Sequence, residues 1–217
     1  MVQTKVKICC IGSVHEAAMA IQYGADAIGL VGKMPSGPGP IEDGLIRSIA
    51  ITIPPPIATF LLTSETSAQQ IIAHHKRTFT NTIQLVDALQ KNEYEIIRQN
   101  IPAIKLVQVI HVIDEGSVEE AIKVSKYVDA ILLDSGNPKL AVKELGGTGR
   151  VHDWKLSRKI KQSIQIPLFL AGGLNATNVR QAIDEVDPYG VDVCSGVRIN
   201  GLLDENKLED FFEAIVK

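Results

Sequence analysis

Two reactive side chains lie at the ends of runs that have the pattern of buried β-strands. Asp134 follows the apolar residues 130–133, and Cys9 lies near the end of Lys5–Ile11. Burial disfavours the charged form of a carboxyl group, so Asp134 is a candidate general acid; a capping or turn aspartate is the alternative. Cys9 is a candidate thiolate base if a nearby dipole or cation lowers its pKa, whereas an inert buried thiol is the usual role of such a cysteine. Both residues are therefore candidates for acid–base chemistry.

Small residues follow the last two predicted strands. Gly172 and Gly173 stand shortly before a helix candidate that begins at Asn178, and Ser195 and Gly196 follow the final strand. Glycine lets backbone amides approach an anion closely, and the N-terminus of a following helix adds favourable partial charge. Tight turns alone would also explain the glycines. We expect the four small residues to bind the phosphate group of a small substrate.

The elements that position these residues alternate between short aliphatic or β-branched runs and longer amphipathic stretches. The predicted strands are Lys5–Ile11, Ala27–Val31, Ile57–Leu62, Thr82–Leu85, Lys105–His111, Ala130–Asp134, Ile166–Ala171 and Gly190–Cys194. The predicted helices are Val14–Tyr23, Ile41–Ala50, Ser67–Arg77, Glu93–Asn100, Ser117–Ser125, Trp154–Ser163, Asn178–Val186 and Glu205–Val216. Eight such units favour a closed (β/α)₈ TIM barrel of the α/β class, formed by residues 1–217 as a single domain. An open doubly wound sheet is the competing architecture.

A barrel of this kind gathers the C-terminal ends of its strands around one pocket, and its loops after strands seven and eight commonly hold a phosphate. The position of the two small-residue loops therefore agrees with phosphate binding. Lys33, His111 and Gly147 lie at or after the ends of predicted strands two, five and six, and are weaker candidates for substrate binding. His74 and His75 fall in a polar helix, and we expect them on its solvated face.

The composition excludes several classes of function. The chain has 22 Lys and Arg against 25 Asp and Glu, a net charge of −3, which is not the basic footprint of a nucleic-acid binder. No apolar run approaches the ~18 residues that span a bilayer, so we expect no membrane partner. Three cysteines, two of them adjacent, do not form a disulfide framework and fit a reducing cytoplasm. The expected partners are small molecules or other proteins, with the chain as a monomer or a homodimer.

A metal site built from Cys9, Cys10 and Cys194 is disfavoured. The first and last strands are neighbours in a closed barrel, but adjacent side chains on a strand point to opposite faces. We therefore expect no metal, and the acid and base proposed above suit a reaction without a cofactor.

Six segments occur in the order and spacing of one known family. They are Val6-Lys7-Ile8-Cys9-Cys10-Ile11, the strand that ends at Asp134, Gly146-Gly147-Thr148-Gly149 with Asp153-Trp154, Ala171-Gly172-Gly173-Leu174-Asn175, Pro188-Tyr189-Gly190-Val191-Asp192-Val193, and Ser195-Gly196-Val197. They resemble the phosphoribosylanthranilate isomerase family over most of the chain, and most specifically in the last third. The resemblance implies a barrel that performs a cofactor-free Amadori rearrangement in tryptophan biosynthesis, from an N-glycosylated anthranilate with a ribose 5-phosphate to the ribulose derivative. It further implies that Cys9 removes the C2′ proton, that Asp134 protonates the ring oxygen, and that the four small residues hold the phosphate.

The chain departs from the family pattern near the expected anthranilate end. Cys10 stands where the family has a glycine, Cys194 where it has a serine, and Arg198 where it has a glutamate. Residues 32–39 lack the arginine that recognises the anthranilate carboxylate, and Lys33 would supply only a point charge in its place. The leading interpretation is a phosphoribosylanthranilate isomerase. The alternative is a divergent barrel isomerase, or a binding protein, for another phosphorylated sugar.

Overall fold

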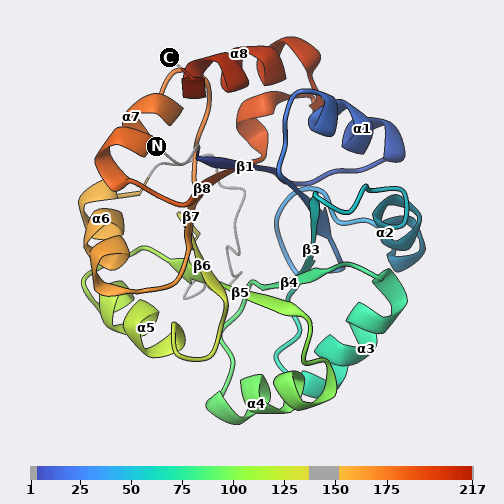
Figure 1. Ribbon diagram of the computed structural model, residues 1–217, viewed down its shortest axis with the longest axis vertical. Coiled ribbons are helices and arrows are strands. Elements are labelled where there is room, and N and C mark those ends of the chain that lie inside the picture. The colour runs from blue at the N-terminus through green and yellow to red at the C-terminus, as the bar shows by residue number, and fades with distance from the viewer. Residues whose placement is uncertain (1–3, 137–151, 217) are drawn as a thin grey trace.

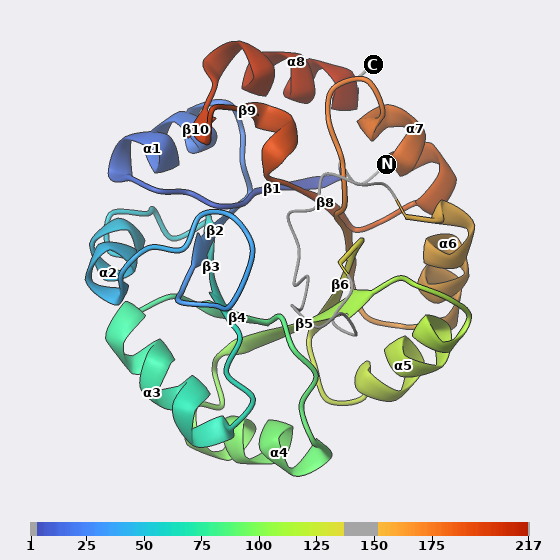
Figure 2. The ribbon, with the colours of Figure 1, turned by 180° about the vertical axis from the view of Figure 1, so that it is seen from behind.

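In the computed structural model, which describes residues 4–136 and 152–216, parallel strands close into a barrel in chain order. The strands are β1 (Lys5–Ile8), β2 (Ala27–Val31), β3 (Ala58–Thr63), β4 (Thr82–Leu85), β5 (Lys105–His111), β6 (Ala130–Asp134), β7 (Leu168–Leu170) and β8 (Gly190–Val193). The helices are α1 (Val14–Gln22), α2 (Asp43–Ala50), α3 (Ala68–Thr78), α4 (Lys91–Asn100), α5 (Gly116–Val124), α6 (Trp154–Ser163), α7 (Val179–Val186) and α8 (Glu205–Val216). They form an outer ring around the strands (Figure 1), and the view from behind shows the same ring (Figure 2). The predicted (β/α)₈ architecture is confirmed, and none of the described helices has the length and apolar character needed to cross a membrane.

Side chains of the strands divide between two hydrophobic layers, because successive residues of a strand point to opposite faces. Ile8 and Leu133 belong to the larger layer, between the strands and the helices. Phe60 and Leu132 belong to a smaller layer inside the barrel. A charged side chain on the inner face is therefore removed from water, and its pKa responds to the few groups around it.

The barrel closes between its first and last strands. β1 pairs with β8 in parallel register, with Lys7 opposite Asp192. One residue beyond the end of β1, the Cys9 amide still donates a hydrogen bond to the Val193 carbonyl oxygen at 2.8 Å. The ends of β1 and β8, far apart in the sequence, are thus neighbours at one rim of the barrel.

Most element boundaries lie within two residues of the predicted ones, but β1 is shorter than expected. It ends at Ile8 instead of Ile11, since Cys10 has a left-handed backbone conformation with φ +61° that does not continue a strand. A short antiparallel hairpin of β9 (Arg198–Ile199) and β10 (Leu202–Leu203) follows β8 and was not predicted.

The prediction for His74 was wrong, because this residue is buried and His75 is half-buried. His74 Nδ1 lies 3.0 Å from Thr63 Oγ1, and its Nε2 lies 3.0 Å from Asp43 Oδ1. Both ring nitrogens thus have polar partners, which makes burial of the imidazole tolerable. The polar composition of α3 gave no indication of these contacts, which join α3 to β3 and α2.

Candidate active site

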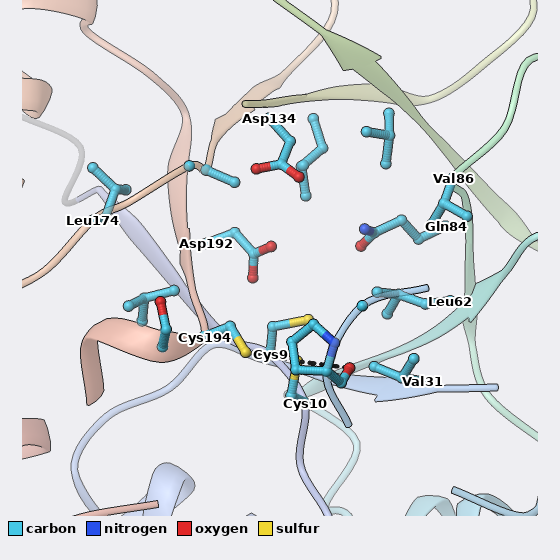
Figure 3. Close-up of a pocket in the computed structure, with 18 of the residues that line it drawn as sticks. Cys9, Cys10, Val31, Leu62, Gln84, Val86, Asp134, Leu174, Asp192 and Cys194 are labelled. Carbon is cyan, nitrogen blue, oxygen red and sulfur yellow. Dashed lines mark hydrogen bonds between the residues drawn. The ribbon is translucent and has the colours of Figure 1, made fainter. Parts of the chain in front are cut away.

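A cavity opens at the C-terminal ends of the strands. Five of the residues predicted from the sequence line it: Cys9, Asp134, Gly172, Gly173 and Ser195. Asp134 and Cys9 face the same space from β6 and from the end of β1 (Figure 3). Much of the remaining wall is apolar and includes Val31, Leu62, Val86, Val109 and Leu132. The fold therefore brings the candidate acid, the candidate base and most of the candidate phosphate-binding residues together.

Asp134 is the carboxyl group expected to act as an acid, and only 7% of its surface is exposed. Its pKa is raised to about 6, chiefly because burial disfavours the carboxylate. A hydrogen bond from the backbone of Ser135 opposes the shift, and the negative charge of Asp192 adds to it. A carboxyl group with this pKa can donate a proton near neutral pH, as a general acid must.

A buried ion pair that was not predicted from the sequence lies next to Cys9. Lys7 Nζ contacts Asp192 Oδ1 at 2.8 Å, with the lysine side chain fully buried and the aspartate nearly so. The ammonium group also lies 5.2 Å from the centre of the Phe60 ring. Burial disfavours the charge on Lys7, but the negative charges of Asp192 and Cys9 outweigh it, so the pKa of Lys7 is raised. The sequence did contain a signal, because charged residues in the middle of two buried strands need a partner.

The Cys9 thiol is close to this cation. A Cβ added at Gly29 would lie 2.7 Å from Cys9 Sγ and 2.9 Å from Lys7 Nζ, so both groups share the space that glycine leaves open. A hydrogen bond from the Cys10 thiol does most to lower the pKa of Cys9; burial opposes this shift, and the Lys7 ammonium adds to it. The resulting thiol is more acidic than an ordinary cysteine, which is the property that a thiolate base requires.

All three cysteines line the cavity, which corrects the prediction that Cys9 and Cys10 point to opposite faces. That prediction assumed an extended strand, whereas the left-handed backbone at Cys10 turns its side chain toward the same space. The Cys194 thiol donates to Cys10 Sγ at 2.7 Å, and Cys10 Sγ lies 3.6 Å from the Pro38 carbonyl oxygen. The three side chains are free thiols. Across residues 4–136 and 152–216, no three His, Cys, Asp or Glu side chains are grouped so that they could hold a metal ion.

The two small-residue loops meet at one side of the cavity. Gly172 and Gly173 have φ values of +87° and +66°, which glycine adopts without strain. A Cβ at Gly196, which is not itself in the lining, would overlap the Leu174 carbonyl oxygen, so glycine allows the two loops to touch. Within the described residues, the amides of Gly173, Ser195 and Gly196 donate to no protein acceptor. Unpaired amides gathered in one place are suited to binding an anion.

The Arg198 side chain contacts residues at the rim of the barrel and does not line the cavity. Its guanidinium group pairs with Glu16 Oε1 at 3.0 Å and donates to the carbonyl oxygens of Cys9, Cys10 and Gly201. The side chains of Arg198 and Glu16 are both largely buried. Arg198 therefore fixes the end of β1, and it does not replace the missing arginine of the loop after β2.

Two of the three weaker candidates, Lys33 and His111, do not line the main cavity. Lys33 is exposed on the loop after β2 and is not among the lining residues, and His111 lines an adjoining, separate cavity. Gly147 lies outside the described residues. Gln84, which was not predicted, projects from β4 into the main cavity (Figure 3), and its Oε1 has no hydrogen-bond partner among the residues described. The sequence marked Gln84 only by its place near a strand end.

Comparison with known proteins gives consistent results. Residues 62–214 match the family model described as N-(5′phosphoribosyl)anthranilate (PRA) isomerase. The chain is 38% identical over 209 residues to N-(5′-phosphoribosyl)anthranilate isomerase 2 of Methanosarcina mazei, covering 95% of this chain and 92% of the relative. A crystal structure of phosphoribosyl anthranilate isomerase in complex with reduced 1-(o-carboxyphenylamino)-1-deoxyribulose 5-phosphate matches with a TM-score of 0.79 and 27% identity, over 99% of both chains. A structure of monomers generated from the dimeric enzyme of Thermotoga maritima matches with a TM-score of 0.79 and 26% identity, also over 99% of both chains.

Proposed function

The chain belongs to the N-(5′-phosphoribosyl)anthranilate isomerase family, and we propose that Cys9 and Asp134 carry out its isomerisation as base and acid. The observation that carries this assignment is the shared cavity. In it a carboxyl group with a raised pKa and a thiol with a lowered pKa face the same space. Both shifts favour proton transfer near neutral pH, because each group then changes protonation state readily.

The reaction needs one proton donated and one removed. Asp134 donates its proton to the ring oxygen, the bond between that oxygen and C1′ breaks, and the nitrogen lone pair forms an iminium ion. Cys9 then removes the proton from C2′, and the electron pair of that C–H bond neutralises the iminium ion to give an enolamine. Addition of a proton at C1′ and loss of the hydroxyl proton at C2′ complete the ketose. These two transfers balance the earlier ones, so Asp134 and Cys9 return to their starting forms.

Lys7 acts on the reaction through Cys9. Its ammonium group, held by Asp192 at 2.8 Å, supplies a fixed positive charge beside the thiolate. Because the site is buried, water screens this charge little, and the electrostatic effect on the thiolate is large. Lys7 is thus a positioning residue that helps to keep the base ionised, and Asp192 holds the Lys7 ammonium group in place.

The two ends of the substrate are proposed to bind at opposite ends of the cavity. The phosphate accepts hydrogen bonds from the amides of Gly173, Ser195 and Gly196, which have no protein acceptor among the described residues. The aromatic ring lies against the apolar wall that includes Val31 and Leu62. The described part of the lining contains no lysine or arginine, so within that part only neutral donors can meet the anthranilate carboxylate.

Purified protein and freshly generated phosphoribosylanthranilate provide the test, with loss of the substrate's fluorescence as the signal. Cys9→Ala and Asp134→Asn should each abolish turnover while phosphate binding stays near that of the unmodified protein. Near-normal activity in either variant would refute the role assigned to that residue.

The three free thiols support a reducing cytoplasmic setting. Light scattering of the purified protein would decide between the monomer and the homodimer.

A further inference from the structure

Cys10 and Cys194 form a thiol pair with no part in the proton transfers proposed above. Cys10 follows β1 and Cys194 follows β8, and these strands are hydrogen-bonded neighbours where the barrel closes. The two sulfur atoms lie 2.7 Å apart, although 184 residues separate them in the sequence. A disulfide has an S–S length of about 2.05 Å, so small side-chain movements are enough to form the bond.

We propose that Cys10 and Cys194 are a modification site, at which a low-molecular-weight disulfide oxidises the two thiols to an intramolecular disulfide. Cys194 is the accessible member, because it is half-buried whereas Cys10 is 7% exposed. The bond would join the ends of β1 and β8 beside the base, and it would do so in the cavity that holds the substrate.

The exchange occurs in two balanced steps. The Cys194 thiol loses its proton to water, and its thiolate attacks one sulfur of the small disulfide RSSR, whose S–S bond breaks; one thiolate RS⁻ leaves and takes a proton from water. Cys10 then loses its proton to water and attacks the Cys194 sulfur of the mixed disulfide, and the second RS⁻ leaves and takes a proton from water. The two protein thiols are oxidised by two electrons in total, and RSSR is reduced to two RSH.

Oxidation would reduce the activity because it removes the Cys10 S–H group. That group donates the hydrogen bond that does most to keep Cys9 ionised. Cys10 also packs against the loop after β2. Its Sγ lies 3.6 Å from the Pro38 carbonyl oxygen, and a Cβ added at Gly39 would lie 2.7 Å from Cys10 Cβ. The effect on activity rests on the proposed role of Cys9, whereas formation of the bond does not.

The test treats the complete reduced chain with oxidised glutathione and maps disulfides by mass spectrometry of its peptides. We expect a cross-link between the peptide with Cys9 and Cys10 and the peptide with Cys194. The cross-link should persist in Cys9→Ala and disappear in Cys10→Ala and in Cys194→Ser. A cross-link that is lost in Cys9→Ala but kept in Cys10→Ala, or no cross-link at all, would overturn the proposal.

Activity supplies a second readout. Oxidised protein should lose about tenfold in kcat/KM for each unit by which the pKa of Cys9 rises, and dithiothreitol should restore it. Cys194→Ser is the matched control, since its hydroxyl group still donates to Cys10 but forms no disulfide; its activity should be the same before and after oxidation. A cross-link without any activity change would refute the role of the Cys10 S–H group in keeping Cys9 ionised and leave the modification site intact. Equal reversible inactivation of Cys194→Ser would refute the modification site.

Discussion

Replacing Lys7 with methionine should raise the pKa of the Cys9 thiol and slow the reaction at every pH below that pKa. The substitution keeps the side-chain length and removes a charge that is fully buried beside the sulfur. Unit charges about 4 Å apart interact by about 4 kcal/mol at an effective dielectric constant of about 20, equivalent to about 3 pKa units. Relaxation of the site reduces this shift, so kcat/KM near neutral pH should fall by about 10- to 1,000-fold.

The assay is kcat/KM against pH, because the position of its acidic limb reports the pKa of the base in the free enzyme. In Lys7→Met this limb should move to higher pH. Asp192→Asn is the opposing control, since the Asp192 carboxylate raises the pKa of Cys9, and its limb should move to lower pH. A folded Lys7→Met protein with lower activity but an unmoved limb would refute the electrostatic role of Lys7.

Stability must be separated from catalysis in this experiment. Lys7→Met leaves Asp192 buried without its cation, which should cost about 3–5 kcal/mol of unfolding free energy. The double variant Lys7→Met with Asp192→Asn removes both charges and should recover most of that loss in urea unfolding. Its Cys9 pKa should lie between those of the two single variants.

Three further outcomes follow from the same structure. Asp134→Asn should raise the unfolding free energy by about 3 kcal/mol near pH 8 and by little near pH 3.5. Burial raises the pKa of Asp134 in the folded protein from 3.8 to about 6. The native carboxyl group therefore stabilises the fold at low pH and loses this contribution as pH rises through about 6. Equal effects at both pH values in urea unfolding would contradict the raised pKa. Gly196→Ala should raise KM more than it lowers kcat, because its Cβ forces the phosphate loops apart; a changed kcat with a normal KM would argue against a phosphate site there. Arg198→Met should cost about 3–5 kcal/mol, because it leaves the Glu16 carboxylate buried without its partner, and Arg198→Lys should cost less; an unchanged melting temperature would show that the rim does not depend on this pair.

The fold was predictable because its signal is repeated along the whole chain. Each strand is a short apolar run and each helix an amphipathic one, so errors at single boundaries do not change the architecture. The end of the first strand was predicted wrongly, because it depends on the left-handed backbone angle of Cys10, which no residue pattern predicts for a non-glycine residue. The position of His74 was predicted wrongly for a related reason, because its partners Thr63 and Asp43 come from other elements.

The site was predictable only where a residue's position in the barrel decides its role. Cys9 and Asp134 stand at strand ends, and in a barrel those ends converge on one pocket. The Lys7–Asp192 ion pair was not predicted, because the pairing of β1 with β8 is a property of the closed barrel and 185 positions separate the two residues in the sequence. The sequence indicates that each of these charges needs a partner, but it does not identify the partner.

The Cys10 hydrogen bond and the buried Lys7–Asp192 pair explain how one cavity can move the pKa values of an acid and a base toward each other. Burial alone raises the pKa of both the Asp134 carboxyl group and the Cys9 thiol, so near neutral pH the carboxyl group keeps the proton that a general acid needs, but the thiol also keeps its proton and cannot act as a base. The Cys10 hydrogen bond does most to offset this effect on Cys9, and the Lys7 cation beside the thiol adds to it. On Asp134 the influence of Lys7 is outweighed by that of Asp192. A lone cation would lower both values, and a lone carboxylate would raise both. The Cys10 hydrogen bond and the paired charges of Lys7 and Asp192 together thus allow the acid to keep its proton while the base gives its proton up.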